Sequence, residues 1–152
     1  MKSIDYYIYL DYSEKLVGYI IVKSEKVGII LPKISKFHHY KDLKHKKSYL
    51  SAVKKTIESK KILEDLLKHK IRELRENLYI FIEVIEFIKT NDNCVIFASI
   101  DDNQYRAFVK LISMIPDKCH TIVRKESELK KGSAEYRLSL IIDTLLNIKR
   151  NE

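Results

Sequence analysis

The chain has 152 residues, of which 45% are hydrophobic and 33% charged, a composition that suits one compact domain over residues 1–152. No apolar run approaches the roughly 18 residues of a membrane span, and the first residues lack the apolar core of a signal peptide. We therefore expect a cytoplasmic protein without membrane contact. The net charge of +8 predicts a polyanionic partner, of which nucleic acid is the commonest.

The first part of the sequence predicts an antiparallel meander of three strands. Residues 5–11 are rich in aromatic and β-branched side chains, and residues 16–23 and 27–31 form two further apolar runs. The connections between these runs are only a few residues long, which favours antiparallel pairing. Pro32 ends the third predicted strand.

A basic, partly helical segment follows over residues 33–72. Between Lys33 and Arg75 there are 14 Lys and Arg residues but only five Asp and Glu. Apolar residues recur at helical spacing over 48–69 and 71–89, as one bent helix or as two. The lysines on its polar face could contact phosphates, although an ordinary solvated face would have the same pattern. The candidates for nucleic-acid binding on this helix are Lys54, Lys55, Lys60 and Lys61.

Strands and helices alternate in the second half of the chain. Residues 94–99 and 119–124 read as strands, and residues 103–114 and 134–149 read as helices. A meander followed by alternation predicts an α/β fold, with a five-stranded mixed sheet and helices on its faces.

Two adjacent carboxylates, Asp101 and Asp102, come directly after the strand predicted at 94–99. Ligand and metal sites of α/β sheets gather where strands end in this way. Asp is also a favoured residue at the start of a helix. We expect Asp102 to be a ligand, whereas Asp101 could serve only to cap the helix that follows.

The element order and the acids resemble the ribonuclease H-like superfamily. Four local matches carry this resemblance, and they are Ile8-Tyr9-Leu10-Asp11-Tyr12-Ser13, Val17-Gly18-Tyr19-Ile20-Ile21-Val22, Ser99-Ile100-Asp101-Asp102-Asn103-Gln104-Tyr105 and Ile142-Asp143-Thr144-Leu145. The resemblance implies three antiparallel strands, then parallel strands and a final helix. It also implies that the basic segment over residues 33–72 is a helical insertion after the third strand.

The resemblance further implies a two-metal site for phosphodiester hydrolysis. Asp11, Asp102 and Asp143 match the acids that would hold Mg²⁺ or Mn²⁺ ions, which prefer carboxylate and water oxygens. The fourth acid belongs to the helix after the meander. We favour Glu73, which lies on a flank of the predicted helix, with Glu76 second because its spacing to Asp102 fits better.

The residues that would read the substrate match the family only in part. Gln104 matches a residue that contacts the minor groove of the substrate, but the other hybrid-reading residues and the proton-transferring His have no match. His38, His39 and His45 lack zinc-ligand spacing and read as surface residues.

We therefore expect a metal-dependent nuclease, an endonuclease that could act on the RNA strand of RNA/DNA hybrids. The alternative is a non-catalytic nucleic-acid-binding module on the same fold. A third hypothesis is an adaptor whose basic helices dock an acidic protein.

Overall fold

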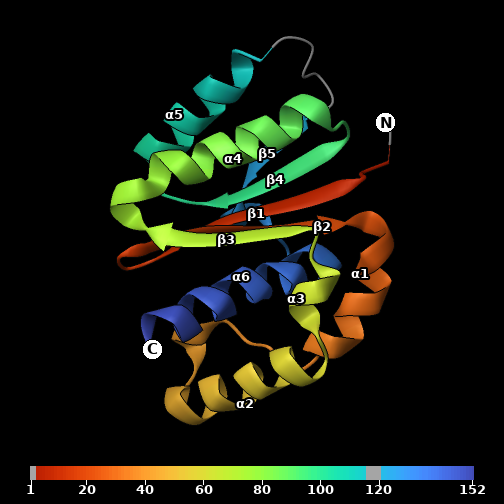
Figure 1. The fold of residues 1–152 in the computed structure, drawn as a ribbon, viewed down its shortest axis with the longest axis vertical. Helices are drawn as coiled ribbons and strands as arrows, with labels where there is room; N and C mark the ends of the chain where they lie inside the picture. The colour runs from red at the N-terminus through yellow and green to blue at the C-terminus, as the bar shows by residue number, and fades with distance from the viewer. Residues whose placement is uncertain (1–2, 116–120) are drawn as a thin grey trace.

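The computed structural model describes residues 3–115 and 121–152 and contains one five-stranded mixed sheet with helices on both faces (Figure 1). The strands lie in the order β3-β2-β1-β4-β5. Their bounds are β1 Tyr6–Ser13, β2 Leu16–Lys23, β3 Lys68–Glu73, β4 Cys94–Ser99 and β5 Thr121–Lys125. The predicted fold class, an α/β fold with a mixed five-stranded sheet, is confirmed at this level.

Strand β1 lies at the centre of the sheet and joins its antiparallel and parallel halves. It pairs antiparallel with β2, which pairs antiparallel with β3, and it pairs parallel with β4, which pairs parallel with β5. The register places Asp11 of β1 between Gly18 of β2 and Ser99 of β4. Asp11 therefore lies near the C-terminal ends of the neighbouring parallel strands β1 and β4.

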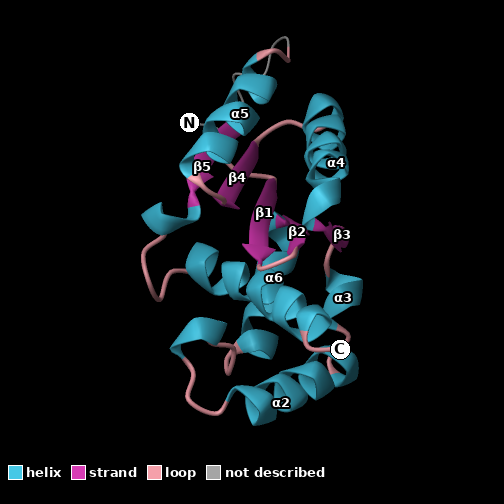
Figure 2. Ribbon diagram, turned by 90° about the vertical axis from the view of Figure 1, so that its left-hand side faces the viewer, coloured by secondary structure: helices cyan, strands magenta, loops and turns pink. Residues whose placement is uncertain are grey.

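Helices α4 (Asn77–Thr90) and α5 (Asp102–Ser113) cover one face of the sheet, and α6 (Ala134–Arg150) covers the other (Figures 1 and 2). The side chains of β1 alternate between two hydrophobic cores. Ile8 and Leu10 belong to the core under α4 and α5, whereas Tyr9 belongs to the core under α6. Asp11 comes two residues after Tyr9, so its side chain points to the same face of the sheet, towards α6.

The predicted third strand is wrong, because residues 27–31 are helical. Helix α1 spans Ser24–Ile30, and a 3-10 segment, η1 Leu31–Ile34, continues it. Short apolar runs do not distinguish a strand from a buried helix. Residues beyond this run favour the helix, since Ile30, Ile34 and Phe37 recur at helical intervals and are all buried.

The third strand is instead β3, which is the outer strand next to β2. Its sequence, Lys-His-Lys-Ile-Arg-Glu, is mostly charged and its first three residues are exposed. Charged side chains protect an edge strand from pairing with other chains, but they also hide it from a search for apolar alternation. The helices predicted at 48–69 and 71–89 were therefore too long.

The helical insertion consequently lies between β2 and β3, not after the third strand. We use "the insertion" for residues 24–67, which hold α1, η1, η2 (Tyr40–Asp42), α2 (Lys46–Ser59) and α3 (Ile62–Asp65). Figures 1 and 2 show α2 on the side of α6 that faces away from the sheet. Its buried residues Leu50, Val53 and Ile57 join the core under α6. Within residues 3–115 and 121–152, no helix has both the length and the apolar character needed to cross a bilayer.

Candidate functional site

Asp11 is a buried carboxylate near the end of β1, only 6% exposed. The backbone N–H of Tyr12 donates to its Oδ1 at 2.8 Å. Its parallel neighbour Ser99, the last residue of β4, also favours the ionised form of Asp11 and lowers its pKa. A charged group buried this deeply needs partners, and these two are weak compensation for lost hydration.

Asp143 lies on α6 and is buried on the same side of the sheet as Asp11, at 7% exposure. Its Oδ2 accepts a hydrogen bond from the backbone N–H of Tyr40 at 2.9 Å. Its Oδ1 lies 3.9 Å from Nε2 of His39 and 3.4 Å from Nδ2 of Asn147. The insertion thus supplies two of the groups that contact this carboxylate.

The charge of Asp143 disfavours the ionised form of Asp11, and we call these two residues the carboxylate pair. Burial raises the pKa of Asp11 well above its usual value, and the charges of Glu126 and Asp143 raise it further. Burial also raises the pKa of Asp143, while the Tyr40 N–H and the His39 side chain lower it. A proton or a cation between these groups would relieve their repulsion.

Glu126 is the third carboxylate near the pair. It follows β5 directly, in the 3-10 segment η4 (Glu126–Glu128). It lines a hollow of about 380 Å³ together with His39 and Ser99. The hollow connects the surface with the end of β4, beside Asp11.

Asp102 lies apart from the carboxylate pair. Its side chain is 79% exposed, and Oδ1 is 2.8 Å from the Lys125 ammonium, which lowers the pKa of Asp102. Asp102 is the first residue of α5, which covers the face of the sheet opposite α6. Asp101 caps α5, because its side chain accepts a hydrogen bond from the Gln104 N–H at 2.8 Å.

Glu73 and Glu76 do not lie on a long helix as the sequence predicted. Glu73 is the last residue of β3 and pairs with Arg75 at 2.7 Å. Glu76 belongs to the 3-10 segment η3 (Leu74–Glu76) and pairs with Arg72 at 3.0 Å. Both acids therefore already have cationic partners.

The predicted nucleic-acid contacts occupy two separate surfaces. The Gln104 side chain is half-buried and accepts a hydrogen bond from the Tyr12 hydroxyl. Lysines 54, 55, 60 and 61 are exposed on α2 and just after it, beyond α6 from the sheet. Their role in binding stays a prediction.

Sequence reasoning missed His39 and Glu126. His39 was interpreted as a surface residue, because nothing in the sequence shows that the insertion folds back onto α6. Glu126 could have been found, since it directly follows a parallel strand just as the acids after β4 do.

Comparison with models of known protein families and with curated proteins finds no match to this sequence.

The donor set suits a hard divalent cation only in part. The carboxylates of Asp11 and Asp143 are the oxygen ligands that Mg²⁺ and Mn²⁺ prefer. Among residues 3–115 and 121–152, however, no three His, Cys, Asp or Glu side chains are grouped so that they could hold a metal ion. The pair could therefore provide two ligands, and a third must move in or come from a substrate.

Proposed function

We propose that this protein is a metal-dependent nuclease of the ribonuclease H-like superfamily. The observation that carries the proposal is a pair of carboxylates, Asp11 of β1 and Asp143 of α6, both buried on the α6 side of the sheet, where the charge of Asp143 raises the pKa of Asp11. The arrangement of three antiparallel strands, two parallel strands and a final helix supports it. RNA/DNA hybrid is the first substrate to test.

Asp11 and Asp143 would hold Mg²⁺ or Mn²⁺, which when bound supplies an activated water and stabilises the leaving oxygen of the phosphodiester. The Tyr40 N–H fixes the orientation of the Asp143 carboxylate, and the Tyr12 N–H fixes that of Asp11. His39 contributes a polar nitrogen beside Asp143 and lines the hollow that Glu126 also lines.

The third carboxylate of the site is Glu126 or Asp102. Glu126 already acts on Asp11 through its charge. Asp102, the residue predicted from the sequence, could join only after its ion pair with Lys125 opens. That pair is exposed to solvent, so opening it costs little.

A non-catalytic nucleic-acid-binding module is the second candidate function. The pairing of Asp102 with Lys125 favours it, because this pairing occupies the acid that the resemblance assigns as a ligand, and no three acids or histidines among the described residues are grouped as a metal site. In that case the carboxylate pair would share a proton, and binding would depend on salt but not on a divalent ion.

The test is hydrolysis of labelled RNA/DNA hybrid, duplex DNA, branched DNA and single strands with Mg²⁺ or Mn²⁺. We expect Asp11→Asn and Asp143→Asn each to reduce the rate more than about a hundredfold, because even outer partners of metal ligands are worth about 10- to 100-fold. Glu126→Gln and Asp102→Asn, compared side by side, identify the third carboxylate by the larger reduction.

Asp42→Asn is the matched control, since Asp42 is an exposed acid that lines the same hollow. It should cleave within about twofold of the unmodified protein. The nuclease proposal is wrong if every substrate stays intact with both metals, or if Asp11→Asn cleaves as fast as the unmodified protein.

A further inference from the structure

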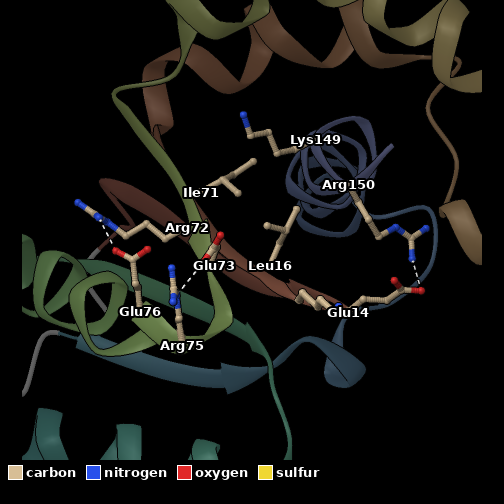
Figure 3. A pocket seen from close by; sticks show the side chains of 10 residues that line it. Glu14, Leu16, Ile71, Arg72, Glu73, Arg75, Glu76, Lys149 and Arg150 are labelled. Carbon is tan, nitrogen blue, oxygen red and sulfur yellow. Dashed lines mark hydrogen bonds and ion pairs between the residues drawn. The ribbon is translucent and has the colours of Figure 1, made fainter. Parts of the chain in front are cut away.

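A second hollow, of about 640 Å³, lies where β3 ends and α6 ends (Figure 3). Five cationic side chains and three glutamates line it, and we call it the basic hollow. In Figure 3 the side chains of Leu16 and Ile71 lie between the arginines of the β3 end and the basic residues of α6. The five cations are Lys15, Arg72, Arg75, Lys149 and Arg150.

The ion pairs in the basic hollow are weak and exchangeable. Arg75 and Glu73 have 82% and 58% exposed side chains, and Glu14, the partner of Arg150, is 68% exposed. Exposed pairs of this kind contribute little, because water screens them. Lys15 has no ion pair with any described residue, so the hollow carries surplus positive charge.

Arg72 has hydrogen-bonding capacity that its partner does not use. Its Nη1 contacts Glu76 at 3.0 Å, but its buried Nε has no hydrogen-bond partner among the described residues. The guanidinium lies 5.2 Å from the centre of the Tyr79 ring, which holds it in place. The Arg72 side chain is 33% exposed, and the planar fork of a guanidinium suits the oxygens of a phosphate.

The basic hollow is connected to the carboxylate pair through Arg150. Its guanidinium lies 5.3 Å from the centre of the Tyr40 ring, and the N–H of Tyr40 donates to Asp143. A neighbouring hollow of about 510 Å³ shares Lys15 and Arg75 and extends the basic surface past the end of β3. Arg150 therefore lines the basic hollow and also acts on Asp143, because its charge lowers the pKa of that carboxyl.

We propose that the basic hollow binds the phosphodiester backbone of the nucleic acid whose reactive phosphate lies at the carboxylate pair. The inference rests on the proposed function for this alignment with the pair. It assigns the backbone contact to the end of β3 and α6 rather than to the lysines of α2. Lys15, Arg75 and Lys149 make the phosphate contacts that can be removed without disturbing buried groups, since all three are exposed.

The experiment measures binding in EDTA, so that it does not depend on cleavage. Fluorescein-labelled single strands and RNA/DNA hybrid are titrated by anisotropy over a series of salt concentrations. The test variant is Lys15→Gln/Arg75→Gln/Lys149→Gln. The matched control is Lys36→Gln/Lys44→Gln/Lys110→Gln, which removes three exposed positive charges elsewhere. A third variant, Lys54→Gln/Lys55→Gln/Lys60→Gln, tests α2.

We expect the test variant to bind at least about tenfold more weakly than the control at low salt. For single strands, the slope of the logarithm of the binding constant against the logarithm of the salt concentration should become shallower by about 2. This corresponds to roughly 0.7 for each phosphate that is no longer neutralised. Equal binding by test and control variants, or weaker binding confined to the α2 variant, overturns the inference. The inference is also overturned, in favour of an acidic protein partner, if polyglutamate displaces the labelled strand as effectively as unlabelled strand does.

Failure of the nuclease proposal gives a different result. If the protein binds nucleic acid through the basic hollow in EDTA but cleaves nothing with Mn²⁺, then catalysis is refuted and the hollow remains the binding surface. If the protein shows no salt-dependent binding in EDTA, the inference about the hollow is refuted whatever the cleavage assays show.

Discussion

Asp11 reaches the α6 side of the sheet by parity alone. One residue earlier or later on β1, the carboxylate would lie under α4 and α5, in a core of apolar side chains. The same parity places Ser99 of β4 beside it and separates it from Tyr12, which lies against Gln104 on the other face. The position of a single residue thus decides which acids can meet.

The raised pKa of Asp11 predicts that Asp11→Asn stabilises the metal-free protein at neutral pH. Asp11 ionises less readily in the folded state than in the unfolded state, so its charge opposes folding above its folded pKa. Each unit by which the pKa is raised corresponds to about 1.4 kcal/mol. We expect the melting temperature in EDTA to rise by at least about 2 °C.

The sign of the pH dependence provides the check on this prediction. As the pH falls through the folded pKa of Asp11, the native protein takes up a proton and regains stability, so the advantage of Asp11→Asn should shrink towards roughly pH 4. Circular dichroism melts across this range measure it. An advantage that grows as the pH falls would show that ionised Asp11 stabilises the fold.

At the scale of the elements, Gly18 permits the close contact between α6 and the sheet. A Cβ atom there would lie 2.8 Å from the Lys70 carbonyl oxygen and 3.2 Å from Cδ1 of Ile142. Gly18 is also the β2 partner of Asp11, and Ile142 precedes Asp143 on α6. The same glycine therefore sets the spacing of β2, β3 and α6 around the carboxylate pair.

Gly18→Ala should lower the free energy of unfolding by about 1 to 3 kcal/mol, as overpacking of a close-packed core does. Gly28→Ala is the control, because Gly28 lies within α1 and a Cβ there meets nothing within 4 Å. It should be neutral or stabilise by up to about 1 kcal/mol through helix propensity. Urea unfolding measures both variants, and equal effects at the two sites would contradict the close approach at Gly18.

The sequence predicted the central strands, missed the outer strand β3 and assigned the helix α1 to a strand. Residues of β1, β2 and β4 are buried on both faces, and these strands lie where the apolar runs are. Strand β3 is an outer strand whose apolar content is Ile71 alone, so local pattern could not identify it. Asp11 and Asp143 were predicted together, whereas His39 depends on how the insertion folds back, which is a long-range contact.

At the scale of the whole molecule, the insertion belongs to the core rather than forming a separate unit. Its residues Ile30, Val53 and Ile62 share one hydrophobic cluster with Tyr9 of β1 and Leu146 of α6. Removing apolar side chains from the insertion should therefore weaken the sheet as well, because the packing on both sides of the cluster is disturbed at once.

Ile62→Ala should destabilise the entire protein by about 2 to 5 kcal/mol, the usual cost of truncating a fully buried Ile. Its neighbour Leu63 is 37% exposed, so Leu63→Ala is the matched control and should cost less than half as much. Far-UV circular dichroism and tyrosine fluorescence should give coincident unfolding curves in both variants, since the insertion and the sheet share their core. Two separate transitions in Ile62→Ala, with the insertion unfolding first, would show instead that Tyr40 and His39 can separate from Asp143 while the sheet stays folded.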